Sequence, residues 1–144
     1  MGATLTGGEH MSKELTKLKK KADDVWSKYI RYRDGQREVD GWYSTCITCG
    51  STKPMKAMHC GHFVSRSCNL LRFDEQNTNA QCPRCNLFHS GEQYEYARQL
   101  DLKYGNGTAE SLHNQRHINH KLTITELEGI IKYAQEQVDF YETI

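Results

Sequence analysis

Apolar residues recur every three to four positions near both ends of the chain, which is the spacing of one helix face. The first such stripe spans residues 12–33 and ends at Asp34-Gly35, a sequence that terminates helices. Its members are Leu15, Leu18, Ala22, Val25, Trp26, Tyr29 and Ile30. We therefore predict an amphipathic N-terminal helix, with Ser12 as its cap.

A second apolar stripe follows Thr123 and Thr125. Its members are Leu127, Ile130, Ile131, Ala134, Val138 and Tyr141. Each threonine has a glutamate three residues later, Glu126 or Glu128, and this is the sequence of a capping box. We predict a final helix that starts at one of these threonines. Its apolar face is expected in the core, and a dimer interface is the alternative use of that face.

The middle of the chain has the composition of short strands. Residues 41–58 are predicted to form short strands around a turn, because residues 41–47 are aromatic and β-branched and the cysteine pair that follows them forms a tight turn. Residues 57–64 are predicted to form a second strand. Residues 65–80 are rich in Asn and Ser, which predicts a long irregular connection. Connections of this length are more often functional than idle.

Helical sequence returns after the predicted strands. Pro83 favours a first helical turn, and the predicted helix over residues 83–104 ends at the glycines of residues 105–107. Thr108 is a cap for a short helix that reaches about Arg116. Central strands between terminal helices predict an α+β fold.

Length and composition favour one small domain. The chain has 144 residues, of which 37% are hydrophobic and 26% charged, and this supports a modest core. It has no run of 18 apolar residues and no export signal, so we expect a cytoplasmic protein without membrane contact. The predicted divisions are a cloning leader or disordered terminus, a basic amphipathic helix, a core and a helical extension, at residues 1–11, 12–40, 41–104 and 105–144.

Charge is unevenly distributed along the chain. Residues 11–90 carry a net charge of +6 and residues 91–144 a net charge of −4. A basic front part suits a polyanionic partner, and Lys20 and Lys21 are candidates for contacts with nucleic-acid phosphates. A solvated helix face is the alternative explanation for these lysines.

Six cysteines in a chain without an export signal favour metal ligands over disulfides. Four of them form two pairs, each with two residues between its members: Cys46 and Cys49, then Cys82 and Cys85. Two such pairs close tetrahedrally on Zn²⁺, and four thiolates leave no open position for water. We predict a structural zinc site with the outline of a treble clef. Cys60 and Cys68 are expected to be buried thiols.

Three polar residues stand at set positions around these cysteines. His62 comes late in a predicted strand, Asn77 lies five residues before Cys82, and Asn86 directly follows Cys85. This pattern resembles the HNH, or ββα-metal, endonucleases, which are built on a treble-clef zinc scaffold. The resemblance implies that His62 is the general base and that Asn77 stabilises the loop that positions it. It also implies that Asn86 binds a catalytic Mg²⁺ or Mn²⁺.

Longer motifs narrow the resemblance. The segments CGHFVSR, LRFDEQN, QCPRCN and SGEQY are similar to the phage NinG/Rap recombination nucleases, and the similarity covers roughly residues 40–140. It implies that the core is a zinc-stabilised DNA endonuclease that cuts branched recombination intermediates, such as D-loops and Holliday junctions, by phosphodiester hydrolysis. It also implies phage or host recombination proteins as partners, in the cytoplasm of a bacterial host.

Arginines and a glycine complete the candidate site. Arg66 is placed to bind a non-bridging phosphate oxygen, with Arg72 and Arg84 as weaker candidates. Gly61 departs from many HNH enzymes, which carry Asp or His as a second metal ligand before the base. The Gly-His pair is similar instead to the non-specific ββα-metal nucleases with an Asp-Arg-Gly-His motif. Other candidates for the second ligand are His59, Asp74 and Glu75.

Two other functions stay open. A zinc-stabilised nucleic-acid-binding module without catalysis would use the same scaffold but would not need His62 and Asn86. A protein-interaction adaptor would work through the acidic C-terminal helices. A homodimer is attractive for a junction-cutting enzyme, because resolving a junction often uses two active sites.

Four further histidines have open roles. His89 either reaches the catalytic metal or faces solvent. Surface or core positions are favoured over a second metal site for His113, His117 and His120.

Overall fold

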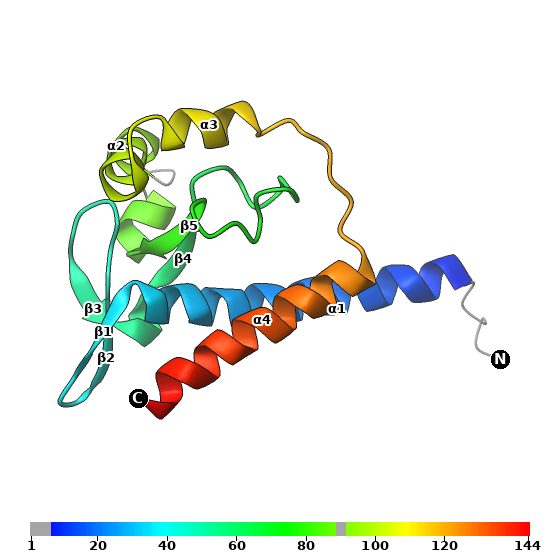
Figure 1. Cartoon of the computed structure of the whole chain (residues 1–144), viewed down its shortest axis with the longest axis horizontal. Helices are drawn as coiled ribbons and strands as arrows, with labels where there is room; N and C mark the ends of the chain where they lie inside the picture. Colours follow the sequence, from blue (N-terminus) through cyan, green and yellow to red (C-terminus); the bar gives the residue numbers. More distant parts are fainter. Residues whose placement is uncertain (1–6, 89–91) are drawn as a thin grey trace.

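The computed structural model describes residues 7–88 and 92–144. Two long helices, α1 (Gly7–Arg33) and α4 (Ile124–Thr143), pack along one another on one side of the molecule (Figure 1). The opposite side holds two small sheets and two shorter helices, α2 (Gln93–Tyr104) and α3 (Thr108–Asn114). This arrangement is the predicted α+β class.

Both sheets are antiparallel. The first has the order β1-β2-β3 and the second pairs β4 with β5. Their strands are β1 (Gly35–Glu38), β2 (Gly41–Thr45), β3 (Thr52–Pro54), β4 (His59–His62) and β5 (Thr78–Gln81). Short helical turns follow β3 and β5: η1 (Met55–Ala57) and η2 (Arg84–Phe88). In the second sheet, Gly61 lies opposite Asn79 and His62 opposite Thr78.

The two apolar stripes meet in the core, as predicted. Trp26 and Ile30 of α1 form one buried cluster with Ala134 and Val138 of α4. Leu127 packs with Ala22 and Leu122 in a neighbouring cluster. The prediction that the C-terminal stripe lies in the core is therefore confirmed.

Helix α1 is also joined to the β4–β5 sheet by polar contacts. The indole Nε1 of Trp26 donates to Thr78 Oγ1 at 3.0 Å. Arg33 Nη2 donates to the carbonyl of Thr78 at 2.8 Å and to Asn79 Oδ1 at 3.1 Å. The N-terminal helix is thus part of the wall around β5.

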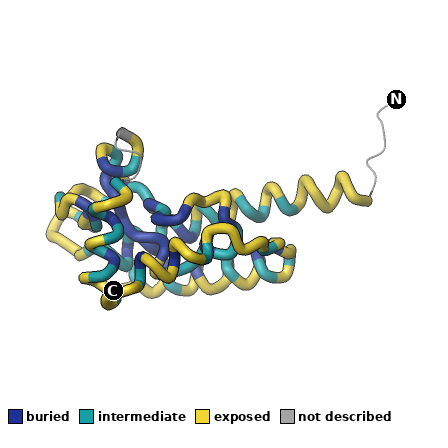
Figure 2. The backbone as a smooth tube through the Cα atoms, turned by 90° about the horizontal axis from the view of Figure 1, so that it is seen from above, coloured by how far each residue is buried: buried dark blue, intermediate teal, exposed yellow. Residues whose placement is uncertain are grey.

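Helix α1 starts earlier than predicted. It begins at Gly7, so residues 7–10, which the sequence assigned to a leader, are helical; residues 1–6 lie outside the described residues. Figure 2 shows the first turns of α1 as exposed backbone that extends away from the rest of the molecule. Propagation from an established helix needs no apolar stripe, which explains the difference.

The predicted helix over residues 83–104 is interrupted. The π-helical turn η2 ends at Phe88, α2 begins at Gln93, and Glu92 between them has a left-handed backbone with φ of 50°. A residue in this conformation cannot continue a right-handed helix. His89 lies outside the described residues. Helix α3 ends at Asn114, two residues before the predicted boundary.

Two strands were missed. β1 has the polar sequence GQRE and is mostly exposed, so it shows no alternation of apolar and polar residues. β5 lies inside the predicted irregular connection, and its sequence TNAQ is buried at all four positions. Polar strand residues of this kind give no period-2 signal.

In the described part of the chain, no helix combines the length and the apolar character needed to cross a bilayer.

Candidate metal centre and adjoining cavity

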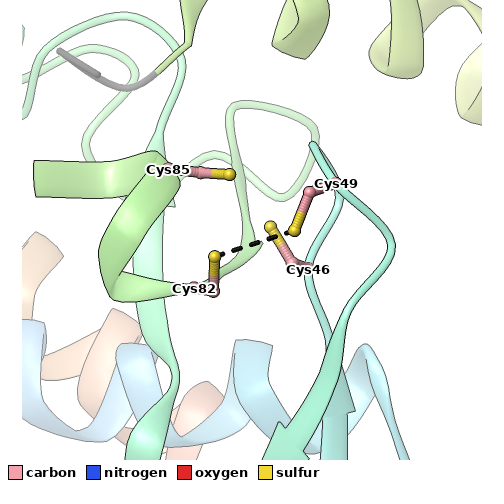
Figure 3. A group of neighbouring side chains, drawn as sticks. All are labelled: Cys46, Cys49, Cys82 and Cys85. Atoms are coloured by element: carbon pink, nitrogen blue, oxygen red, sulfur yellow. Dashed lines mark hydrogen bonds between the residues drawn. The ribbon is translucent and has the colours of Figure 1, made fainter. Parts of the chain in front are cut away.

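Four cysteines from two distant segments meet at one point (Figure 3). Cys46 follows β2 and Cys49 lies in the turn before β3, whereas Cys82 follows β5 and Cys85 lies in η2. Gly50 has φ of 74°, a conformation that favours glycine and allows this tight turn. The amide of Gly50 donates to the carbonyl of Cys46 at 2.9 Å.

The distances suit a tetrahedral metal. All four Sγ atoms lie within 4.8 Å of one another, and Sγ of Cys49 lies 3.8 Å from Sγ of Cys82. Four sulfurs that surround Zn²⁺ at about 2.3 Å are about 3.8 Å apart. The cluster can therefore hold a structural metal such as zinc, as predicted.

The protonation of the thiols favours metal binding at one position. Desolvation acts to raise the pKa of Cys49, but hydrogen bonds with Ser51, Cys46 and Cys82 together outweigh it and lower that pKa to about 6. Burial raises the pKa of Cys46 and Cys85. Because metals bind thiolates, Cys49 is ready to bind an ion, whereas Cys46 and Cys85 release their protons when the ion binds.

All six cysteines are described, and all are free thiols, so the disulfide alternative finds no support. Cys68 is buried and Cys60 is half-buried, and both lie outside the four-cysteine cluster. Among the described residues, no other cluster of three or more His, Cys, Asp or Glu side chains is arranged to hold a metal. His113 and His117 are exposed, and His120 pairs with Glu126 at 2.8 Å.

A cavity of about 550 Å³ reaches Asn86, the residue that directly follows Cys85. His62, Arg66 and Asn86 line it together with Cys60, Phe63, Ser65 and Gln93. An adjoining cavity of about 400 Å³ has the same three polar residues in its wall and adds Asp23 and Asp24 from α1 and His59 from β4. The structure thus brings together three of the residues that the sequence singled out.

The ring of His62 is oriented by the backbone. Its Nε2 lies 2.9 Å from the carbonyl oxygen of Arg72. A carbonyl only accepts hydrogen bonds, so Nε2 carries the hydrogen and Nδ1 keeps the lone pair. Burial lowers the pKa of His62 below its usual 6.5, although the Arg72 hydrogen bond and the charge of Asp23 act in the opposite direction. The imidazole is therefore neutral at pH 7.

Asn77 fastens the loop that follows His62. It is completely buried, and its Oδ1 accepts from the amide of Val64 at 2.7 Å. Its Nδ2 donates to the carbonyls of Val64 and Leu71, each at 3.0 Å. The backbone carbonyl of Asn77 accepts from Phe63 at 2.9 Å. The bonds reach the two residues after His62, so Asn77 holds the loop that follows this histidine.

Of the three residues proposed as a second metal ligand beside Asn86, one contacts it and two do not. Its Nδ2 donates to His59 Nδ1 at 3.0 Å. Asp74 instead accepts from the amides of Gln76 and Asn77 in a turn. Glu75 accepts from the hydroxyls of two tyrosines, Tyr29 and Tyr133. Of the three candidates for a second metal ligand, only His59 lies at Asn86.

Position 61 has no room for a side chain. A Cβ on Gly61 would lie 2.2 Å from Oε1 of Gln81, on the paired strand. The carbonyl of Gly61 accepts from the Tyr96 hydroxyl at 2.7 Å. Close packing of β4 against β5 therefore explains the glycine where many HNH enzymes carry a ligand.

The predicted cationic contacts differ in their surroundings. Arg72 forms two hydrogen bonds to the carboxylate of Asp23 and is largely buried. Lys20 is exposed and pairs with Asp24 at 3.1 Å. Lys21 and Arg84 are exposed, and of the predicted phosphate ligands only Arg66 lines both cavities.

Sequence reasoning missed Asp23. It lies on α1, 23 residues before Cys46 and 49 residues before Arg72, and its periodic position beside Ala22 carries no chemical signal. An acidic pair within a lysine-rich helix was the one feature that could have marked it.

Comparison with known proteins identifies the family. Residues 8–142 match the family described as "Bacteriophage Lambda NinG protein". The chain belongs to the NinG family. Protein ninG of Escherichia phage 933W is 31% identical over 122 residues, which cover 83% of this chain and 56% of that protein. Protein ninG of Escherichia phage lambda is 30% identical over 122 residues, which cover 83% of this chain and 55% of that protein.

A further NinG relative, from Salmonella phage P22, is 29% identical over 126 residues, or 86% of this chain and 58% of that protein. This NinG-family chain thus spans about half the length of the curated relatives it matches. No solved structure shows significant similarity to it.

Proposed function

We propose that this chain is a metal-dependent DNA endonuclease that hydrolyses phosphodiester bonds in branched recombination intermediates. The observation that carries the proposal is the shared cavity: His62, Arg66 and Asn86 line one space, and Asn86 directly follows Cys85 of the four-cysteine cluster. These residue types supply a base, a phosphate ligand and an oxygen ligand for a cation, which are the groups that phosphodiester hydrolysis needs.

The scaffold in this proposal is a treble-clef, ββα-metal core. One cysteine pair lies on a turn between strands and the other lies after β5 and in η2. The β4–β5 hairpin between the pairs carries His62 at the end of β4. A structural zinc on the four thiolates would hold both segments in place, because four thiolates complete its coordination.

His62 acts as the general base. Its Nε2 hydrogen is engaged by the Arg72 carbonyl, so Nδ1 is the atom that accepts a proton from water. Burial keeps the imidazole neutral at pH 7, which is the form that a base requires. Asn77 acts indirectly: it holds the Val64 backbone in place, and thus the end of β4.

Asn86 is the candidate ligand for Mg²⁺ or Mn²⁺. Its Nδ2 donates to His59, and its Oδ1 is a hard oxygen of the kind that these ions prefer. Mg²⁺ keeps several waters and needs few protein ligands, so the glycine at position 61 is compatible with such a site. When bound, the ion would polarise the phosphate and stabilise the leaving oxygen.

Arg66 binds the scissile phosphate. Its side chain is 62% exposed and lies at the wall of both cavities, so it can reach a bound strand. Arg84, Lys20 and Lys21 are exposed cations that add backbone contacts without reading sequence. Arg72 serves the site through its carbonyl and its pair with Asp23 rather than through phosphate.

The substrate class rests on the NinG/Rap resemblance. D-loops and Holliday junctions are the branched substrates that it implies, with phage or host recombination proteins as partners in the bacterial cytoplasm. A homodimer would supply the two active sites that paired cuts at a junction require. All of these are properties of the whole protein, and the matched residues cover only 56% and 55% of two of its relatives.

A cleavage assay tests the proposal. Wild-type protein and a His62→Ala variant are incubated with Mg²⁺ or Mn²⁺ and labelled Holliday junction, D-loop, flap and linear duplex. We expect selective cutting of branched DNA by the wild type and a loss of at least about 100-fold in the variant. His10→Ala, an exposed histidine in the first turns of α1, is the matched control and should cut normally.

The outcome separates the enzyme from its main alternative. Salt-dependent binding of DNA without cutting of any substrate would indicate a zinc-stabilised nucleic-acid-binding module. Gly61 favours that alternative, because its packing against Gln81 leaves the position without a ligand. Cleavage that persists in His62→Ala would contradict the assignment of the base.

A further inference from the structure

Asp23 of helix α1 holds a nearly buried arginine. Its Oδ1 accepts from Arg72 Nε at 3.0 Å and its Oδ2 accepts from Arg72 Nη2 at 2.5 Å. The side chains of Asp23 and Arg72 are only 17% and 15% exposed. A two-bond carboxylate–guanidinium pair with this little exposure fixes the position of both groups.

The same arginine holds the candidate base. The carbonyl of Arg72 lies 2.9 Å from Nε2 of His62. Asp23 is therefore connected through one residue to the ring whose orientation and tautomer determine which nitrogen faces the cavity. This connection runs through side chains and one carbonyl, because α1 and β4 are far apart in the sequence, with the whole first sheet between them.

A second arginine lies near the same carboxylate. Arg66 Nη1 is 3.8 Å from Asp23 Oδ2, and its side chain is exposed where that of Arg72 is not. Arg72 is thus held tightly and Arg66 loosely by one negative charge. The loose pair leaves Arg66 able to turn toward a phosphate, at the cost of separating from Asp23.

We propose that Asp23 is a positioning residue of the nuclease site: through Arg72 it orients His62, and through its charge it restrains Arg66 until a phosphate arrives. This inference rests on the proposed function. It makes helix α1 a part of the site, although the sequence assigned that helix only to basic contacts with DNA. In this proposal Asp23 contacts neither the attacking water nor the phosphate of the substrate.

Asp23→Asn separates this role from a merely structural one. The amide places an N–H donor against one of the two guanidinium donors, so Arg72 and the loop that carries its carbonyl lose their fixed position. We expect kcat to fall by about 10-fold to 100-fold, as misplacement of a catalytic group does. We expect DNA affinity to rise severalfold, because a negative charge leaves a cavity that binds a polyanion. Unfolding would lower both quantities.

The experiment compares three proteins: wild type, Asp23→Asn and Asp24→Asn. Asp24 is the matched control, because it lies next to Asp23 on α1 and lines the same cavity but pairs with the exposed Lys20. Turnover is measured on Holliday junction with Mn²⁺, and affinity is measured on the same DNA without a divalent ion. The ring nitrogens of His62 are followed by ¹⁵N NMR, which distinguishes the Nε2–H tautomer from its alternative.

Each outcome decides one question. Lower kcat and loss of the Nε2–H tautomer in Asp23→Asn alone support the inference, whereas tighter DNA binding is expected in both variants, because each removes a negative charge from the same cavity. An unchanged tautomer in Asp23→Asn overturns it, whether or not the wild type cuts DNA, and so does an equal loss of kcat in Asp24→Asn. A wild type that cuts nothing overturns the proposed function, while the tautomer still tests the Asp23 contact.

Discussion

At the residue scale, Asn77 shows how one buried amide can hold a loop. Its side chain satisfies the amide and carbonyl of Val64 and the carbonyl of Leu71, all in a buried environment. Backbone groups buried without partners are costly, so the amide replaces the hydrogen bonds that a regular strand would have made. Few other side chains offer both a donor and an acceptor in this geometry.

Asn77→Ala should therefore destabilise the protein strongly. Three backbone groups lose their partner in a site that water cannot fill easily, and we expect a loss of about 2–4 kcal/mol in the free energy of unfolding. Urea denaturation checks the value, with the exposed Asn119→Ala as the control. A loss below about 1 kcal/mol would mean that the loop keeps its path without this amide.

The His62 imidazole predicts the pH dependence of cleavage. Its pKa is lowered by burial from the usual 6.5, and the neutral ring is the form that the proposed base requires. The rate should be full at neutral pH and should fall as pH decreases through that lowered pKa, when the ring takes up a proton. We expect the acidic limb of kcat/KM to have its midpoint below 6.5. A midpoint above 6.5 would exclude a buried imidazole as the group responsible.

At the element scale, the start of α4 is set by one threonine. Oγ1 of Thr123 accepts from the amide of Glu126 at 3.1 Å, and the helix begins at the next residue, Ile124. Thr125 lies inside the helix, so the alternative start that the sequence allowed is wrong. The cap satisfies one of the amides that a helix N-terminus leaves unpaired.

Thr123→Ala should cost about 1 kcal/mol of stability, because the cap is lost and nothing replaces it. For a chain of this size the melting temperature would fall by about 2–4 °C. Thr125→Ala, two residues later and also exposed, is the matched control and should leave the melting temperature within about 1 °C. Equal shifts in both variants would show that helix propensity, and not capping, sets the effect.

Elements with a strong apolar period were predictable, and polar ones were not. Helices α1 and α4 carry stripes that only a 3.6-residue period explains, and both stripes are in the core. β5 is buried at every position but consists of Thr, Asn, Ala and Gln, and its Thr78 and Asn79 side chains donate to the carbonyls of Asp74 and Gln76. Such a strand depends on tertiary partners, and these do not appear in a local pattern.

Some residues of the candidate site could be predicted from the sequence, and others could not. His62, Asn77 and Asn86 could be found because they stand at fixed separations from the cysteine pairs. Asp23 could not, since its role arises only when α1 packs against the loop of Arg72, and no spacing along the chain records that contact. Arg72 was identified as a cation, but its buried pair with Asp23 could not be foreseen.

At the scale of the whole molecule, the four-cysteine cluster joins segments that the remaining core joins only weakly. It connects the β2–β3 turn to the start of η2, and its own apolar surroundings are small: Met58 and Ala80 are the other members of that buried cluster. The principal apolar cores lie elsewhere, between α1 and α4 and around Tyr96 and Leu100. A bound metal would therefore supply much of the cohesion of this end of the protein.

Removal of the metal should unfold the β2–β3 turn and the segment around η2, and should thereby open the cavity that Asn86 lines. Four thiolates bring like charges together when no cation is present, so the apo cluster either protonates or separates. We expect a zinc chelator, or Cys85→Ser, to lower the melting temperature by more than about 10 °C and to abolish cleavage. Cys68→Ser is the control, because it changes a buried cysteine outside the cluster. We expect this variant to bind zinc and to cleave DNA. Asn86 directly follows Cys85, and His62 lies on β4, which pairs with β5. A chelated protein with an unchanged melting temperature would contradict the structural role of the metal.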